Sequence, residues 1–171
     1  RIYVLTPQAR VIELPEGSTP VDFAYRLHTD LGHRCRGARV DGQLVSLNTP
    51  LQTGQTVEVI TAKSGGPSRD WLTPQLGYLA SPRARAKVRL WFNAVELQKR
   101  IATGQDLVEK ELQRLGKTAT NLEQLANKLG FSHAEDLYVS VAKEEFSLRG
   151  IAQAFVEQEE VKPDEEVLAR L

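Results

Sequence analysis

The side chains best suited to chemistry lie in one short stretch that begins at His33. Arg34 follows it directly, and Arg36 and Arg39 come within the next six residues. An imidazole can stack and form a hydrogen bond, while guanidinium groups pair with phosphates and stack on bases. This combination suits single-stranded RNA, whose unstacked bases and ribose hydroxyls are accessible. On composition alone, an ordinary loop histidine is the alternative interpretation.

Catalytic and metal sites are not indicated by the residue types. The histidines are His28, His33 and His133, and the lone Cys35 excludes an internal disulfide and a cysteine-based zinc site. No carboxylate cluster accompanies the histidines, so we expect no metal and no cofactor. No catalytic serine motif is present, and Gly65-Gly66-Pro67 lacks the Lys-Ser/Thr of a phosphate loop. The chain is therefore expected to bind and not to catalyse.

Composition places the chain among ordinary globular proteins. It has 171 residues, 41% hydrophobic and 26% charged, and no methionine, which favours a piece of a longer protein. No apolar run reaches membrane length and no signal pattern opens the chain, so we expect no membrane partner and a cytoplasmic location. The net charge of zero hides segregation, because residues 67–103 carry seven basic and two acidic residues. A basic middle suits an anionic partner, although a solvated helix face would look the same.

The elements before His33 are predicted as a hairpin and one helix. Residues 2–6 and 10–14 are rich in strand formers and flank a turn. The helix is expected over Pro20–Leu31, with Thr19 and Asp22 as a capping box and Gly32 as a stop of positive φ. His28 would then lie on its buried flank, with Tyr25 and Arg26 between or outside the apolar stripes, and His33 would begin a basic loop.

Three further strands are predicted after this loop. Residues 34–40 and 43–46 flank Asp41-Gly42, a strong two-residue hairpin signal. A bulge at Gly37 would turn Cys35, Ala38 and Val40 to one face. Residues 56–61 alternate cleanly and should form a well-buried last strand. One helix on a sheet of about five strands is the β-grasp, or ubiquitin-like, arrangement, so the fold class is α+β.

The rest of the chain is predicted to be helical. Residues 64–80 form a linker anchored by aromatic and leucine side chains, and residues 81–158 form an all-α domain before an acidic tail, 159–171. Its helices are expected over 82–102, 106–115, 122–129, from a Ser132 cap to 143, and from Ser147 to about 158. On the first of these, Ala84, Val88, Trp91 and Val95 share a face that is flanked by basic side chains.

Several of these motifs resemble a known family. Tyr3-Val-Leu-Thr-Pro7, the run Leu14–Tyr25 and His28-Thr-Asp-Leu-Gly-His33 resemble a TGS domain, predicted over residues 1–63. Arg34-Cys35, the runs 51–54, 57–61 and 67–72, and Ser81–Arg89 are similar to the long RelA/SpoT-family (p)ppGpp synthetases. The match is dense over residues 1–92 and looser from about 104. It implies the regulatory half of such an enzyme, without the hydrolase and synthetase domains.

The resemblance also implies a partner and a set of contact residues. In ribosome-associated members, the TGS domain grips the CCA end of uncharged tRNA, and the histidine matching His33 lies at the terminal adenosine. A hydrogen bond to the terminal ribose would be lost when an amino acid is esterified there. The expected 3′-end contacts are His33, Arg34, Arg36 and Arg39. The expected auxiliary phosphate contacts are Arg69, Arg83, Arg85, Lys87 and Arg89.

A protein-interaction role is the alternative. Some relatives bind acyl carrier protein through the TGS domain, and the same arginines could receive that acidic partner. The helical part could also transmit an inhibitory state to the hydrolase and synthetase domains of a longer parent. A TGS appendage of a threonyl-tRNA synthetase or a GTPase suits the run 67–89 less well.

Overall fold

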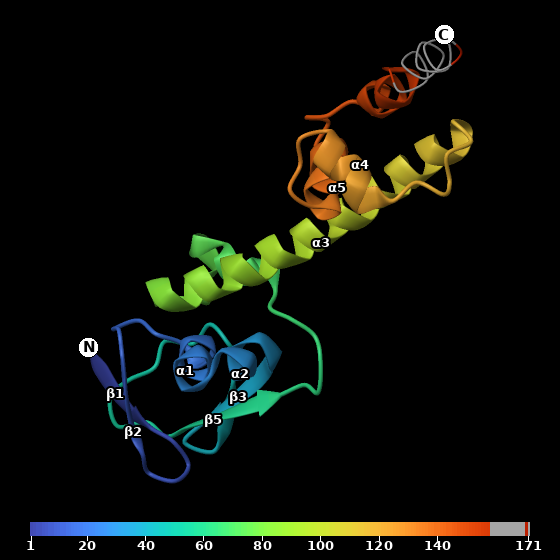
Figure 1. Cartoon of the computed structure of the whole chain (residues 1–171). Helices are drawn as coiled ribbons and strands as arrows, with labels where there is room; N and C mark the ends of the chain where they lie inside the picture. The colour runs from blue at the N-terminus through green and yellow to red at the C-terminus, as the bar shows by residue number, and fades with distance from the viewer. Residues whose placement is uncertain (158–169, 171) are drawn as a thin grey trace. The chain divides into compact units, whose positions relative to one another are not determined.

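The computed structural model describes residues 1–157 and 170, which fall into two compact units divided between Asn93 and Ala94 (Figure 1). The first unit combines strands and helices, and the described part of the second is helical. The predicted α+β class, a β-grasp-like domain followed by a helical region, is confirmed.

The first unit contains a hairpin and a three-stranded sheet. β1 (Ile2–Leu5) pairs antiparallel with β2 (Val11–Leu14), while β3 (Cys35–Val40) lies between β4 (Gln43–Val45) and β5 (Val57–Thr61). A parallel bridge between Leu5 and Thr56 joins the two sets. Asp41 and Gly42 have φ values of 50° and 83°, as a two-residue hairpin turn requires. The predicted hairpins are confirmed.

β3 contains the predicted bulge, but one residue earlier than expected. Gly37 pairs with Ile60 and Cys35 pairs with Thr61, so Arg36 is the extra residue. An exposed arginine suits this position because its side chain can leave the sheet. The bulge does bury Cys35, Ala38 and Val40 together, as expected.

The prediction of a well-buried last strand is wrong. Within β5 (Val57–Thr61), Val57 is fully buried, whereas Val59 and Ile60 are half-buried and the other residues are exposed. The strand lies at the edge of the β4-β3-β5 sheet, so one of its sides has no neighbouring strand in that sheet.

The predicted helix up to Leu31 is wrong, because the chain breaks at His28. α1 (Pro20–Leu27) begins with the expected capping box and ends at His28, which is extended at φ −163°. The His28 Nδ1 accepts the Asp30 backbone N–H and so caps a second helix, α2 (Thr29–Arg34). His28 is exposed and not buried. Gly32 lies inside α2 and is not in the left-handed region.

α1 is buried on two sides. On one side, Phe23 packs with the strands. On the other, Val21, Ala24 and Tyr25 pack with side chains from the stretch that follows the sheet, namely Trp71, Leu79, Ala84 and Val88. Tyr25, expected outside the apolar stripes, is only 2% exposed. Residues 64–80 include two 3-10 turns, η1 (Arg69–Leu72) and η2 (Pro74–Leu76), and their anchoring by Trp71 and Leu79 is as predicted. The compact unit therefore extends well beyond residue 63.

α3 (Pro82–Arg114) is one continuous helix, so the predicted break between residues 102 and 106 is wrong. In the second unit, Gly104 does not end the helix but makes room for a neighbour. A Cβ on Gly104 would lie 1.8 Å from the Tyr138 carbonyl oxygen. The glycine is therefore explained by close approach and not by helix termination.

The described core of the second unit is built by α3, α4 (Leu122–Lys128), α5 (Ala134–Ala142) and the helical residues 148–157. His133, not Ser132, is the N-cap of α5, with Asp136 as its capping-box partner. The predicted cap is thus wrong by one residue. Ser147 accepts the Arg149 N–H at the start of the next helix, as expected. The predicted end of that helix and the acidic tail lie outside the described residues, apart from Arg170.

Candidate nucleic-acid interface

His33 lies in the last turn of α2 and not in a loop. Its Nδ1 atom is 2.9 Å from the Tyr25 hydroxyl oxygen, and the two rings meet edge to face at 5.3 Å. The Trp91 ring centroid lies 6.3 Å from the His33 ring. Aromatic side chains therefore orient the imidazole, and the residue is partly exposed.

Gly32 allows α2 to lie directly on the Tyr25 ring. A Cβ on Gly32 would fall 2.1 Å from Cδ1 and 2.3 Å from Cγ of Tyr25. Trp71 also restricts the Tyr25 ring, because the two rings meet edge to face with their centroids 6.2 Å apart. The position of His33 therefore depends on the preceding residue, Gly32, having no side chain.

Both members of the Tyr25–His33 pair are neutral near pH 7. Burial lowers the pKa of His33, the nearby Asp30 carboxylate raises it, and the Lys87 ammonium lowers it, so the net direction is downward. Burial is also the main reason why the pKa of Tyr25 is raised above its usual value. The pair is thus a hydrogen bond between two uncharged groups.

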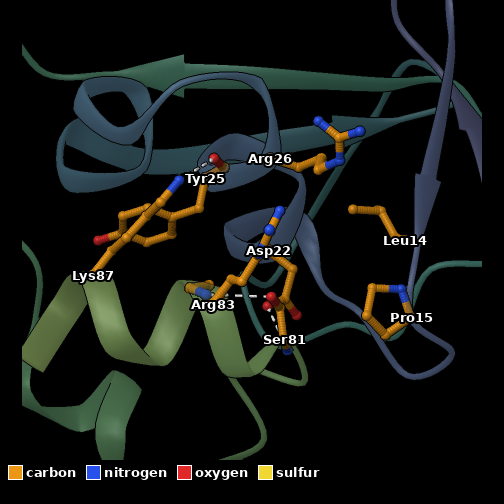
Figure 2. Close-up of a pocket in the computed structure, with 9 residues that line it drawn as sticks. Leu14, Pro15, Asp22, Tyr25, Arg26, Ser81, Arg83 and Lys87 are labelled. Carbon is orange, nitrogen blue, oxygen red and sulfur yellow. Dashed lines mark hydrogen bonds between the residues drawn. The ribbon is translucent and has the colours of Figure 1, made fainter.

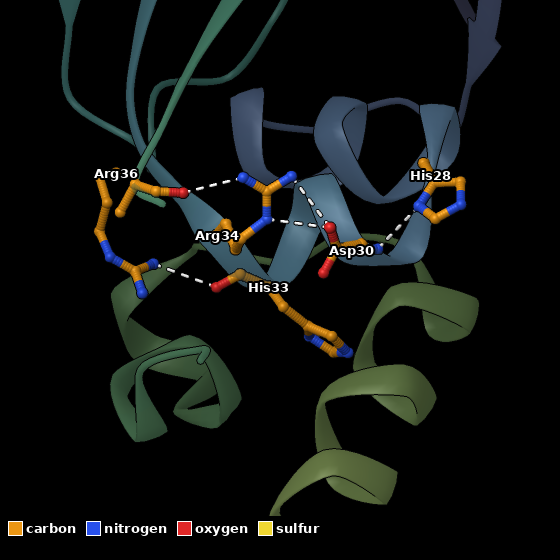
Figure 3. A network of polar contacts seen from close by, with 6 residues as sticks. His28, Asp30, His33, Arg34 and Arg36 are labelled. Atoms are coloured by element: carbon orange, nitrogen blue, oxygen red, sulfur yellow. Dashed lines mark hydrogen bonds and ion pairs between the residues drawn. The ribbon is translucent and has the colours of Figure 1, made fainter. Parts of the chain in front are cut away.

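The arginines beside His33 hold the local structure together (Figure 3). Arg34 pairs with Asp30 at 2.9 Å and donates to the Ala62 carbonyl. Arg36 donates to the carbonyls of His33, Cys35 and Gly66. Both guanidinium groups therefore tie α2 and β3 to the chain that follows β5. Their predicted contacts with a 3′ end stay predictions.

A pocket with several basic side chains in its lining has Tyr25 in its wall (Figure 2). Its volume is about 100 Å³, and its lining includes the side chains of Arg26, Arg83 and Lys87. Lys87 Nζ is 3.4 Å from the Tyr25 carbonyl oxygen. Within residues 1–157, no acidic group pairs with Arg26 or Arg83, so their charge is available to an anion. Arg26 was not foreseen, although its exposed place in the last turn of α1 was readable.

Asp22 also lines this pocket, and its carboxylate is bound by backbone N–H groups. Its carboxylate accepts the backbone N–H groups of Thr19, Ala80 and Ser81 at 2.9–3.0 Å. Burial is the largest influence on this carboxyl and raises its pKa, while these hydrogen bonds lower it. The group joins the start of α1 to the start of α3 within the first unit.

Comparison with known families agrees with this architecture. The TGS domain family matches residues 2–61, and the RelA/SpoT AH domain family matches residues 91–156. The chain is a TGS domain followed by a RelA/SpoT AH domain. This confirms the resemblance to RelA/SpoT proteins.

Similar proteins are several times longer than this chain. The GTP pyrophosphokinase of Escherichia coli K12 is 38% identical over 167 residues, 97% of this chain and 22% of that protein. The GTP pyrophosphokinase of Photobacterium angustum is 43% identical over 142 residues, 82% of this chain and 19% of that protein. The bifunctional (p)ppGpp synthase/hydrolase RelA of Mycobacterium tuberculosis is 40% identical over 160 residues, 89% and 21% of the two chains. The chain spans about a fifth of these relatives.

Apart from Arg83 and Lys87, the predicted contact residues do not line the basic pocket. The Arg69 guanidinium stacks over the Phe92 ring at 4.5 Å, and Arg85 donates to the Leu79 carbonyl. Arg39 lies on β3, and its Nη1 atom forms an ion pair with Glu58 Oε1 at 3.9 Å. Arg89 is exposed and does not line the pocket. Of the predicted auxiliary residues, only Arg83 and Lys87 line it.

Neither a metal centre nor a membrane segment is found among the described residues. In residues 1–157 and 170, no three His, Cys, Asp or Glu side chains gather in a way that could hold a metal ion. No helix in the same part is both long enough and apolar enough to cross a bilayer. Cys35 is fully buried in the TGS domain, and burial raises the pKa of its thiol to about 11.

Proposed function

We propose that this chain is a regulatory module of a (p)ppGpp synthetase and binds the 3′ end of uncharged tRNA on the ribosome. The names of its relatives support the first part, since they are GTP pyrophosphokinases and a (p)ppGpp synthase/hydrolase. The observation that supports the second part is the His33 imidazole, which Tyr25 orients and which is partly exposed. The activity of the parent would belong to domains outside this chain.

Discrimination would come from the terminal ribose. A ribose hydroxyl within reach of His33 can form a hydrogen bond, whereas an esterified amino acid adds bulk at the same oxygen. Leaving a polar group unpaired costs about 1–3 kcal/mol, which corresponds to roughly 5- to 150-fold in affinity. Such a ratio is sufficient for a sensor, and no chemical step is needed.

The pocket cations would hold phosphates of the same strand. Arg26, Arg83 and Lys87 are displayed on α1 and α3, and Tyr25, whose hydroxyl contacts His33, lines the same pocket. Each phosphate contact to a single strand contributes a slope of about −0.7 to the dependence of log K on log salt. Two or three contacts therefore predict a slope of roughly −1.4 to −2.1.

Binding of the whole chain to two forms of one tRNA tests the proposal. One form is deacylated, and the other carries an amide-linked amino acid that resists hydrolysis. We expect tighter binding of the deacylated form, and loss of that preference in His33→Ala. His133→Ala, a change at an exposed histidine of the AH domain, is the control. Equal affinities for both forms, or a silent His33→Ala, would refute it.

The same assay with acyl carrier protein examines the alternative. If the chain still binds acyl carrier protein as His33→Ala but not as Arg34→Ala/Arg36→Ala, the result would favour a protein-interaction module. Because Arg34 and Arg36 also hold α2 and β3, the double variant needs a folding control by circular dichroism.

A further inference from the structure

Tyr25 is a core residue whose hydroxyl reaches a partly exposed side chain. Its ring is enclosed by Gly32 and Trp71, and the residue is 2% exposed. Its hydroxyl contacts His33 Nδ1 at 2.9 Å, and its backbone carbonyl accepts from Lys87. An enclosed ring of this kind cannot follow a moving imidazole, so it fixes where the imidazole lies.

We propose that Tyr25 is a positioning residue that holds neutral His33 as its Nε2–H tautomer, so that His33 recognises its ligand as a hydrogen-bond donor. The ligand atom is then an acceptor oxygen, such as a ribose hydroxyl. The identity of that ligand rests on the proposed function, whereas the tautomer does not.

The direction of the hydrogen bond follows from the two groups. A phenol is a better donor than acceptor, and an unprotonated imidazole nitrogen is a strong acceptor. Within residues 1–157, the Tyr25 hydroxyl has no other polar partner, so its proton is free to point at Nδ1. When Nδ1 accepts, the ring proton of a neutral imidazole must reside on Nε2. The nitrogen that does not contact Tyr25, Nε2, is thus a donor.

Burial is the main influence that lowers the pKa of His33 and keeps the ring neutral at physiological pH, and the Lys87 ammonium acts in the same direction. The groups that face it are Asp30 on α2, Lys87 on α3, Arg36 on β3 and Tyr25 on α1. Asp30 is the one acid among them, and it is already paired with Arg34 at 2.9 Å. A doubly protonated ring would also lose the bond from Tyr25, because Nδ1 could no longer accept.

The tautomer changes how an esterified end is rejected. If Nε2 were an acceptor, loss of the hydroxyl proton on esterification would abolish the bond for every amino acid. With Nε2–H as donor, an ester oxygen can still accept weakly, so rejection depends mainly on bulk. A glycyl end should therefore be rejected less strongly than a phenylalanyl end.

Nitrogen-15 NMR of the whole chain reads the tautomer directly, without RNA. We expect His33 Nδ1 to show the shift of an unprotonated nitrogen and Nε2 that of a protonated one. A protonated Nδ1 in the neutral ring would overturn the proposal. This measurement needs no variant, so it does not depend on how well a variant folds.

Tyr25→Phe supplies a second measurement, the pKa of His33, which would not change if Tyr25 acted only through packing. Removing a donor to Nδ1 removes a bond that favours the neutral ring, so the His33 pKa should rise by roughly 0.5–1. If Tyr25 instead accepted from Nδ1–H, the same change would lower the pKa. An unchanged or lowered pKa in a folded Tyr25→Phe chain contradicts the proposal.

RNA binding separates this inference from the proposed function. If both hold, Tyr25→Phe weakens binding of deacylated tRNA by about 2- to 10-fold, less than His33→Ala. If the chain shows the Nε2–H tautomer but binds neither tRNA form, the proposed function fails and the positioning role stands. Equal rejection of glycyl and phenylalanyl ends overturns the donor role even when tRNA binds.

Discussion

Gly32→Ala is the sharpest test of the contact between α2 and Tyr25. Gly32 lies in a helix, where replacing glycine by alanine ordinarily stabilises by about 1 kcal/mol. Here the new methyl group would lie 2.1 Å from the Tyr25 ring, which is held from another direction by Trp71. Neither α2 nor the ring can therefore accept the methyl group without a shift.

The expected effect has the opposite sign to the helix propensity. Overpacking costs about 1–3 kcal/mol, and loss of the Tyr25–His33 bond about 0.5–1.5 kcal/mol. After the gain in propensity of about 1 kcal/mol is subtracted, Gly32→Ala should destabilise the first unit by about 0.5–3.5 kcal/mol. For a unit of this size, that lowers the melting temperature by on the order of 10 °C.

Urea and thermal unfolding followed by tryptophan fluorescence measure this change. The matched control is Gly37→Ala, where an added Cβ meets Ile60 at an ordinary 3.5 Å and φ is not left-handed. The control should remain within about 0.5 kcal/mol of the wild type. A Gly32→Ala chain as stable as the wild type, with an unchanged His33 pKa, would refute the reasoning.

Three further predictions concern buried or paired groups. Asp22→Ala leaves three backbone N–H groups without their acceptor and should destabilise the chain by about 2–4 kcal/mol in urea unfolding. Asp30→Ala removes an exposed ion pair with Arg34 and should destabilise it by at most about 1 kcal/mol. Equal losses of stability in the two variants would contradict this prediction. Because the pKa of His33 is lowered in the folded state, the unfolded chain takes up the proton first, and stability should fall as pH drops below about 6.5, with a smaller slope in His33→Gln. Parallel slopes in the two chains would show that His33 has no part in this dependence. The Cys35 thiol, with its pKa raised to about 11, should resist iodoacetamide at pH 8 until the chain is unfolded, and rapid native labelling would disprove its burial.

Local rules predicted much of the fold. Strand formers, the Asp41-Gly42 turn and the Thr19 cap were all readable, because each depends on neighbours along the chain. The glycines were misread for one reason. Gly32 is predicted as a helix stop and Gly104 falls in a predicted break between helices, yet both allow another part of the same unit to approach closely. Sequence alone does not distinguish these two uses of glycine.

The partner of His33 could not be found from spacing. On one continuous helix, residues 25 and 33 would lie about 12 Å apart along the axis. The break at His28 instead brings Tyr25 and His33 into hydrogen-bond contact at 2.9 Å. The histidine itself was indicated by residue type and by the family resemblance, whereas Tyr25 and Arg26 required the structure.

The stretch between the two family matches has a consequence for exchanging domains among relatives. Residues 62–90 belong to neither match, yet they supply Trp71, Leu79 and Val88 to the first unit and two N–H donors to Asp22. A chimera that replaced residues 2–61 alone would pair a foreign helix α1 with this native stretch. A transplant that keeps this packing has to carry residues 62–90 together with residues 2–61.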